Sequence, residues 1–554
     1  MQRHRSKGMR RTIASAAVVG IALVAAACGG GGGDKGSGSG GGDASAGKPV
    51  KGGTLSYGLE AETSGGWCLA EGQLAISGIQ VARSIYDTLT APDADGKYKP
   101  FLAESVTPNA NFTQWNVKLR SGVKFSDGSP LTSQVVKNNL DAYRGKYPAR
   151  KPLLFIFVLD NIKDVTVVDP LTVSITTKTP WPSLPAFLHS SGRMGMMGQK
   201  QLDDPKTCDR NLIGTGPFKL QDWKVNDRLT VVRNPNYWQK DADGNQLPYL
   251  DSIVFRPLPD ADARLSALQS GEINAMHTSS PQVIDELRTA KEQGSLDAFE
   301  SNKYTEVAYG MMNIGRLPFS NRNARLAMAY GLNRKAYEQA INLGALEPAS
   351  GPFAPGETGY LADAGFPKYD PAKAREYIKK FQAETGKPLE FTIISTPDPG
   401  VQQSVQYLQA QAKKFGAKVN LATREQAALI TQAISGNFDI LSWRNHPGGD
   451  PDLQYVWWKG GNLTNFSKIN DPEINRLLDE GRANPDPAAR KTIYESLNRR
   501  FASEVYNLWL DWSPWTIGHE TGVQGILGPN LPDGSKPFPG LATGHPLEGM
   551  WIKK

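Results

Sequence analysis

The residues best suited to catalysis are few and scattered in this 554-residue sequence. Its histidines are His4, His189, His277, His446, His519 and His545. None of them stands in an H-E-x-x-H motif or in a cysteine and histidine module with zinc-binding spacing. The sequence also has no P-loop and no G-x-S-x-G nucleophile elbow. We therefore expect no metal, no cofactor and no enzymatic activity. A secreted hydrolase stays open as an alternative, because a triad of distant residues is defined by geometry.

Aromatic side chains are better candidates for function. The 12 tryptophans include Trp443, Trp457, Trp458, Trp509, Trp512 and Trp515. An aromatic face beside a few fixed polar groups is how a binding cleft holds peptide side chains or sugar rings. Trp443 is the strongest of these candidates, since it ends the apolar stretch FDILSW and is followed by RNHPGGDPD, which is rich in turn residues. The sequence thus favours binding over catalysis.

The first 27 residues are typical of a signal peptide. Five basic and no acidic residues accompany an apolar run from Ile13 to Ala27, which is shorter than the roughly 20 residues of a membrane span. Without them, 57 Lys and Arg remain against 55 Asp and Glu, so the formal charge falls from +7 to +2. A nearly neutral chain has no general electrostatic reason to bind nucleic acid, and we expect none.

Three alanines directly before Cys28 resemble the lipobox of bacterial lipoproteins. We predict a lipid on the Cys28 thiol and a flexible tether over 28–50, because residues 29–47 are almost all Gly, Ser, Ala, Asp and Lys. The protein would then be extracytoplasmic, anchored to the outer face of the cell membrane or facing the periplasm. An ordinary signal peptide cut nearby is the alternative, and Arg10 with Arg11 leaves twin-arginine export open.

Two cysteines remain after Cys28. Cys68 and Cys208 form an even pair in an oxidising compartment, which predicts a disulfide. Two buried free thiols are the alternative.

The rest of the chain alternates between strand and helix patterns, which predicts a mixed α/β fold. Strands are expected at 52–59, 115–125, 390–395 and 438–443, and a hairpin at 165–177 about the turn Asp169–Pro170. Helices are expected at 79–90, 130–143, 261–273 and 323–341. Thr132 or Ser133 would be the N-cap of the second helix. The sequence has no internal repeat and no heptad run.

Several phrases, in order, resemble family 5 solute-binding proteins of ABC importers. They are SIYDTLT (84–90), PFLAESVTP (100–108), LRSGVKFSDGSPLTSQVV (119–136), IGTGPFKL (213–220), RNPNYW (233–238), ARLSALQSGEINAM (263–276), NARLAMAYGLNRKAY (323–337), and FDILSW followed by GDPD (449–452). The G-x-G of IGTGPFKL has Lys219 where a dinucleotide fingerprint has its third glycine, so we interpret its glycines as a tight crossover between lobes.

The resemblance implies a periplasmic-binding-protein-like clamp of class II, cluster C, with two main lobes and an extra third lobe. Lobe I would comprise 51–89, 211–302 and 514–554, lobe II 90–210, and lobe III 303–513. A monomer would capture a small ligand between lobes I and III by hinge closure and deliver it to the permease of an ABC importer.

The same resemblance places the loop after Trp443 and the loop after the first strand at the ligand. The predicted ligand-binding residues are Trp67, Tyr309, Trp443, Arg444, Asn445, His446 and Asp450. Trp67 could equally pack over a disulfide at Cys68. Peptide-binding relatives usually carry an aspartate for the peptide ammonium at the position of Pro447, so this chain departs from the family there.

Three ligand classes follow. An oligopeptide is expected from the family. A neutral oligosaccharide, stacked on aromatic rings and bonded by Arg444, Asn445 and Gln or Glu side chains, is the alternative that the missing aspartate favours. A nickel chelate is a third possibility.

Overall fold

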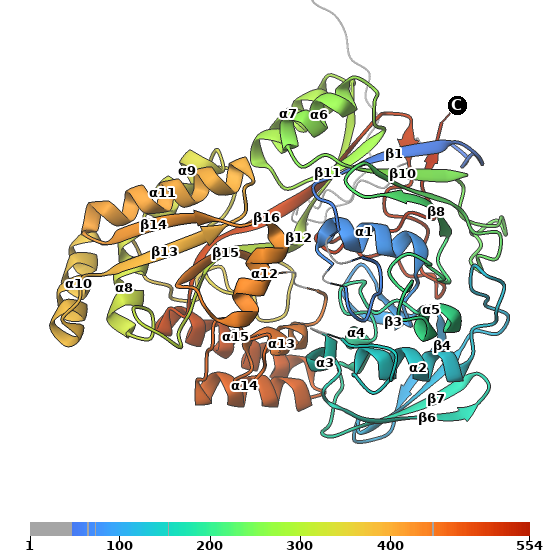
Figure 1. Cartoon of the computed structure of the whole chain (residues 1–554), viewed down its shortest axis with the longest axis horizontal. Helices are drawn as coiled ribbons and strands as arrows, with labels where there is room; N and C mark the ends of the chain where they lie inside the picture. The colour runs from blue at the N-terminus through green and yellow to red at the C-terminus, as the bar shows by residue number, and fades with distance from the viewer. Residues whose placement is uncertain (1–46, 64–65, 73, 153–154, 446–447, 554) are drawn as a thin grey trace, which may run out of the picture. The chain divides into compact units, whose positions relative to one another are not determined.

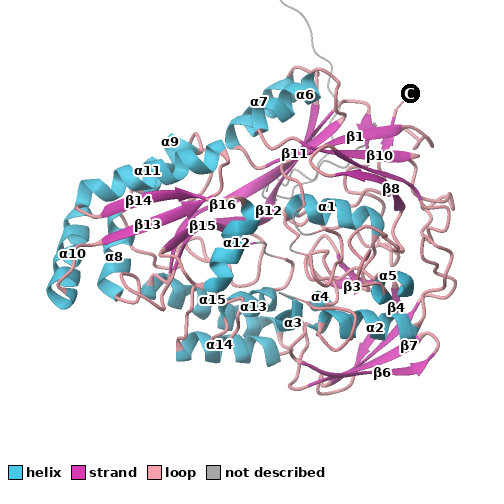
Figure 2. Cartoon of the chain, in the orientation of Figure 1, coloured by secondary structure: helices cyan, strands magenta, loops and turns pink. Residues whose placement is uncertain are grey.

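One ten-stranded mixed sheet organises the chain (Figures 1 and 2). The computed structural model describes residues 47–63, 66–72, 74–152, 155–445 and 448–553, and residues 48–554 form one unit. The strand order is β14-β13-β15-β12-β16-β11-β1-β10-β9-β8. The strands are β1 Thr54–Leu59, β8 Phe218–Lys224, β9 Arg228–Arg233, β10 Ser252–Pro257, β11 Ala275–Thr278, β12 Asp297–Met312, β13 Glu390–Ser395, β14 Lys418–Thr423, β15 Ile440–Asn445 and β16 Asn507–His519.

Three smaller sheets complete the β-structure of the described residues. Their strands are β4 Ala103–Pro108, β5 Gln114–Leu119, β7 Thr172–Thr177 and β6 Ile162–Asp169 in a four-stranded sheet, β2 Thr90–Pro92 with β3 Tyr98–Pro100, and β17 Val523–Gln524 with β18 Trp551–Ile552. The helices are α1 Ile76–Ile85, α2 Ser133–Tyr143, α3 Phe155–Val158, α4 Leu184–Phe187, α5 Gln199–Asp203, α6 Ala261–Gln269, α7 Pro281–Glu292, α8 Arg322–Gly331, α9 Arg334–Ile341, α10 Pro371–Thr385, α11 Pro399–Phe415, α12 Gln426–Ser435, η1 Pro451–Gln454, α13 Tyr455–Trp458, α14 Pro472–Ala483 and α15 Pro487–Glu504.

The structure confirms the mixed α/β prediction and most of its elements. β6 and β7 pair antiparallel on either side of the Asp169–Pro170 turn. Thr132 is the N-cap of α2, because its hydroxyl accepts a hydrogen bond from the Val135 amide. The helix expected over 323–341 is two helices, α8 and α9, because Leu332 has an extended backbone between them.

The helix expected over 79–90 ends earlier than predicted. α1 stops at Ile85, and Tyr86 is already extended. The Gly216 amide donates to the Ile85 carbonyl at 2.8 Å. The segment IGTGPFKL (213–220) therefore hydrogen-bonds the last carbonyl of the helix. A side chain on Gly214 would place its Cβ 2.0 Å from the same carbonyl oxygen. These contacts agree with a tight crossover role for the glycines of IGTGPFKL.

The close approach at Gly214 leads to a first prediction. Gly214→Ala should lower the free energy of unfolding by about 1–3 kcal/mol, because the methyl group must displace backbone of α1. Urea denaturation would measure the loss. Gly522→Ala is the matched control, since the nearest atom to its Cβ is the Lys553 carbonyl oxygen at 3.7 Å. A Gly214→Ala protein as stable as the Gly522→Ala protein would contradict the crossover interpretation.

Two large hydrophobic cores are formed by different parts of the chain. The first contains apolar residues from 55–275 and 515–550, together with Leu453 and Val456. The second contains only residues from 307–512. A third, small cluster lies around α6 and α7. The long strands β12 and β16 contribute to both large cores and therefore connect them.

The pairing of β12 with β16 is interrupted between these cores. Ser301 pairs with Trp515 and Glu306 pairs with Ser513, so the residues 302–305 of β12 lie opposite Pro514 alone. Pro514 has no amide hydrogen to offer the ladder. Tyr304, inside the interruption, has a positive φ of 53°. Such a bulge bends the strand and locally disrupts its ladder with β16.

Candidate functional site

Arg444, on β15, is the centre of a polar cluster beside this interruption. Its guanidinium donates to the Ser279 hydroxyl at 2.8 Å. It also lies 3.4 Å from a Glu306 carboxylate oxygen and 3.8 Å from a Glu60 carboxylate oxygen. Glu60 directly follows β1, whereas Glu306 is on β12 and Ser279 follows β11. The cluster therefore joins four segments that are far apart in the sequence.

The members of this cluster differ in exposure. The Glu306 side chain is 2% exposed, while those of Glu60 and Arg444 are 22% and 36% exposed. Glu306 also accepts a hydrogen bond from the Trp515 indole at 3.0 Å, and the Arg444 guanidinium lies 5.6 Å from the Trp515 ring centre. Glu306 is thus a fixed, buried anchor for Arg444. Glu60, Arg444 and Ser279 are all partly exposed.

The charges of the cluster depend on each other. Burial raises the pKa of Glu60, although Arg444 and Arg264 oppose that effect. Burial by itself would lower the pKa of Arg444, but the carboxylates of Glu306 and Glu60 outweigh it and the pKa is raised. Arg444 is therefore charged at every physiological pH, and Glu60 ionises less readily than an exposed glutamate.

His277 supports the loop that carries Glu60. The Glu60 amide donates to His277 Nε2 at 3.1 Å. Burial lowers the pKa of His277 well below its ordinary value, so the ring is neutral and able to accept this bond. The His277 ring therefore adds no charge to the cluster.

Trp443 and Asn445 lie on the opposite face of β15 from Arg444, because side chains alternate along a strand. The Trp443 indole donates to the Asn445 side-chain oxygen at 3.1 Å, and its ring lies edge-on to Phe466. Trp443 is only partly buried. Asn445 is 2% exposed, and within the described residues its side-chain nitrogen has no hydrogen-bond partner.

Two of the predicted site residues lie in hydrophobic cores. Tyr309 is 1% exposed and packs between Trp458 and Trp509. Trp67 is also 1% exposed and its ring lies edge-on to Trp223. The structure does not bring either of them to the Arg444 cluster. Contact of these two residues with a ligand stays a prediction.

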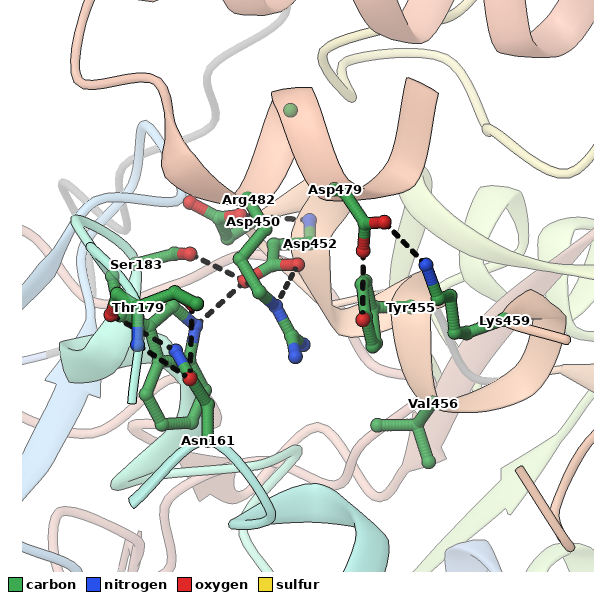
Figure 3. Close-up of polar contacts among 12 residues, drawn as sticks. Asn161, Thr179, Ser183, Asp450, Asp452, Tyr455, Val456, Lys459, Asp479 and Arg482 are labelled. Atoms are coloured by element: carbon green, nitrogen blue, oxygen red, sulfur yellow. Dashed lines mark hydrogen bonds and ion pairs between the residues drawn. The ribbon is translucent and has the colours of Figure 1, made fainter. Parts of the chain in front are cut away.

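Asp450 and Asp452 hold protein groups (Figure 3). Asp450 caps η1 and forms an ion pair with Arg490 at 2.6 Å. Asp452 is fully buried and pairs with Arg482 at 2.9 Å. The other oxygen of Asp452 accepts from the Ser183 hydroxyl at 2.6 Å and the Trp181 indole at 2.8 Å. Both carboxylates thus have partners in the protein, and a ligand role for Asp450 stays a prediction.

The predicted disulfide is confirmed. Cys68 and Cys208 are bonded, with 5.1 Å between their α-carbons. Both side chains are buried, and Trp67 packs beside them. Cys28, His446 and Pro447 lie outside the described residues.

Sequence reasoning did not find Glu60, Ser279 or Glu306. Glu306 had a weak signal, since it directly precedes the largely apolar end of β12, residues 307–312, and an acidic residue needs a partner when it is buried. Glu60 and Ser279 had none, because nothing local relates them to Arg444.

The described residues contain neither a metal-binding cluster nor a membrane-spanning helix. No group of three His, Cys, Asp or Glu side chains there is placed to hold a metal ion. Likewise, no helix in the described part of the chain is long and apolar enough to cross a membrane.

Known sequences agree with the resemblance. The sequence model for "Bacterial extracellular solute-binding proteins, family 5 Middle" matches residues 97–466. The glutathione-binding protein GsiB of Shigella dysenteriae is 32% identical over 451 residues, which cover 78% of this chain and 83% of that protein. GsiB of Salmonella typhimurium is 32% identical over 348 residues, or 62% of this chain, and the alignment spans 65% of the relative's length.

Solved structures agree with the fold. The binding protein AgaA of A. tumefaciens R10, in complex with agropinic acid, is 26% identical and superposes with a TM-score of 0.78 over 91% of this chain and 99% of that one. DppA of Helicobacter pylori, in complex with the peptide STSA, is 21% identical with a TM-score of 0.80, over 91% of this chain and 99% of that one. The predicted periplasmic-binding-protein-like fold is confirmed by these matches.

Proposed function

This chain belongs to family 5 of the bacterial extracellular solute-binding proteins, and from that premise we propose that it captures a short peptide outside the cytoplasm for an ABC importer. The observation that carries the proposal is the Arg444 cluster. It offers two partly exposed charged groups, Glu60 and Arg444, where the two large cores meet beside the bulge of β12. A ligand bound there would contact both cores and favour the state in which they are closed together.

The proposal includes three lobes with the boundaries expected from the family. Lobe I comprises residues 51–89, 211–302 and 514–554, lobe II 90–210 and lobe III 303–513. Closure of lobe III on lobe I would occur at the bulge of β12 opposite Pro514, where the pairing with β16 is interrupted. The protein acts as a monomer and a carrier, without altering its ligand. The similarity to glutathione-binding proteins supports a peptide of two or three residues.

Attachment to the membrane is a separate part of the proposal. Residues 1–27 are removed as a signal peptide, Cys28 carries the lipid, and residues 28–50 tether the protein to the outer face of the membrane. The permease subunits of the importer are the partners, and nucleic acid is not bound.

An oligosaccharide is the second candidate ligand. The partly buried ring of Trp443 favours it, because sugars stack on aromatic faces. This ring does not require a charged ligand.

A thermal-shift screen of the purified protein tests the proposal. The panel contains glutathione, di- to pentapeptides, cello- and xylo-oligosaccharides, and nickel chelates. A short peptide at one hundred times its Kd should stabilise the protein by about 2.7 kcal/mol and raise its Tm. The ligand should be recovered unchanged, as mass spectrometry would verify. Stabilisation by sugars alone would refute the peptide assignment, and hydrolysis of the ligand would refute the carrier role.

A further inference from the structure

Residues 448–456, which follow β15 and contain η1, contact a part of the chain that is far away in the sequence. The Gly449 amide donates to the Tyr98 hydroxyl at 3.1 Å. Leu453 and Val456 are members of the first core, whereas residues that precede and follow this segment are members of the second core. We call residues 448–456 the docking segment. It connects the proposed lobe III to the proposed lobe II.

Asp452 makes the charged contacts of the docking segment with lobe II (Figure 3). Its carboxylate accepts from the Trp181 indole at 2.8 Å and from the Ser183 hydroxyl at 2.6 Å. Its ion pair with Arg482, by contrast, lies within the proposed lobe III. Hydrogen bonds to an ionised acceptor are roughly twice as strong as bonds between neutral groups. The two bonds that cross between the lobes are therefore strong ones.

Lobe II is itself fixed to lobe I. The disulfide joins Cys68 of the proposed lobe I to Cys208 of lobe II. The Arg193 side chain of lobe II donates from Nε to the Leu74 carbonyl of lobe I at 2.9 Å. Apolar residues of both lobes also share the first core. Lobe II therefore stays with lobe I, and an opening movement of lobe III must separate the docking segment from lobe II.

The charges of the docking segment allow this separation. Asp452 and Arg482 both belong to the proposed lobe III, so their ion pair would move as a unit. Water could replace the Trp181 indole and the Ser183 hydroxyl as donors to the carboxylate. Opening thus exchanges two hydrogen bonds with protein for two with water, and leaves no buried charge without a partner.

We propose that Trp181 and Ser183 are positioning residues for ligand capture, which hold Asp452 in the closed state and release it in the open state. This inference rests on the proposed function and assigns lobe II a part in it. The docking segment begins three positions after Asn445, the last residue of β15. Holding this segment therefore fixes the end of the strand that carries Arg444.

The affinity of the protein for its ligand depends on this contact. A ligand that binds the closed state has an apparent Kd that increases as the population of that state falls. Neither Trp181 nor Ser183 belongs to the Arg444 cluster, so loss of their bonds should weaken all ligands by the same factor. The loss should increase the dissociation rate and leave the association rate unchanged, because the ligand first meets the open state.

Isothermal titration calorimetry and stopped-flow dissociation test the inference. Glutathione is the probe, or, if glutathione does not bind, the member of the panel above that raises the Tm most. Trp181→Phe and Ser183→Ala each remove one donor to Asp452. Each should raise the Kd of the probe about tenfold, with an equal rise in the dissociation rate, as expected for a hydrogen bond to a charged group.

Trp238→Phe is the matched control. The Trp238 indole also donates to a buried carboxylate, that of Asp87, at 2.9 Å. The Arg120 guanidinium lies 5.3 Å from its ring centre, as that of Arg482 lies 5.1 Å from the ring centre of Trp181. Both ends of the Trp238 bond belong to the proposed lobe I, so Trp238→Phe should leave the Kd of the probe unchanged. Circular dichroism melting would verify that all variants are folded at the temperature of the titration.

The outcomes separate the inference from the proposed function. If Trp181→Phe and Ser183→Ala bind the probe as tightly as Trp238→Phe, the inference is overturned and the proposed function stands. A loss confined to the association rate, or a loss that differs between ligands, would also overturn the inference alone. If no member of the panel binds the unaltered protein, both are overturned.

Discussion

Replacing Asp452 with alanine should lower the free energy of unfolding by about 3–5 kcal/mol. The Asp452 side chain is completely buried, and its removal leaves the Arg482 guanidinium, 7% exposed, without its carboxylate. The Trp181 indole and the Ser183 hydroxyl also lose their acceptor. An unpaired buried cation costs far more than the ion pair contributes while it is intact. Urea denaturation of the purified protein would measure the loss.

Asp479 provides the matched control. It also pairs with a cation, Lys459, and accepts from the Tyr455 hydroxyl, but its side chain is 55% exposed. Asp479→Ala should cost about 1 kcal/mol or less, because water solvates the freed groups. Asp452→Asn keeps the shape of the side chain, so its loss in free energy of unfolding should lie between the losses of the two alanine variants. Equal losses for Asp452→Ala and Asp479→Ala would contradict the role assigned to burial.

Removing the disulfide should have an effect of comparable size. Cys68 and Cys208 are 140 positions apart. The bond therefore closes a long loop and lowers the conformational entropy of the unfolded chain. The chain-entropy model predicts that the double variant Cys68→Ser with Cys208→Ser loses about 5 kcal/mol. The midpoint of guanidinium unfolding, compared with that of the unaltered protein, would report the loss.

Reducing agent supplies the control for this experiment. Unaltered protein that is unfolded and refolded in dithiothreitol should have the stability of the double variant. The double variant itself should not respond to dithiothreitol. If the double variant matched the oxidised protein in stability, the bond would have no thermodynamic role.

Local elements could be predicted from the sequence because their causes are local. The Asp169–Pro170 turn and the Thr132 cap depend on residues within a few positions of each other. The end of α1 could not be predicted in this way. Its last carbonyl is bonded by Gly216, which is more than 130 positions later in the chain. Only the folded crossover makes that acceptor unavailable to the helix.

The candidate site was predictable in part for the same reason. Arg444 follows Trp443 and begins a turn-rich loop, and these neighbours allowed it to be predicted as a ligand-binding residue. The pairing of β12 with β15 brings Glu306 to it, and the pairings of β12 with β16, β16 with β11 and β11 with β1 bring Glu60, which is a long-range property of the sheet. The burial of Tyr309 also depends on that pairing, since both Trp509 and Trp443 lie opposite it.

The way in which β12 and β16 connect the two large cores also orders their completion during synthesis. Every residue of the second core precedes position 513, and the stretch is continuous from 307 onward. The first core begins with residue 55 but lacks Trp515, Ile517 and the apolar residues that follow until nearly the whole chain has been made. The part of the protein that is translated first is therefore the last to acquire all of its strands.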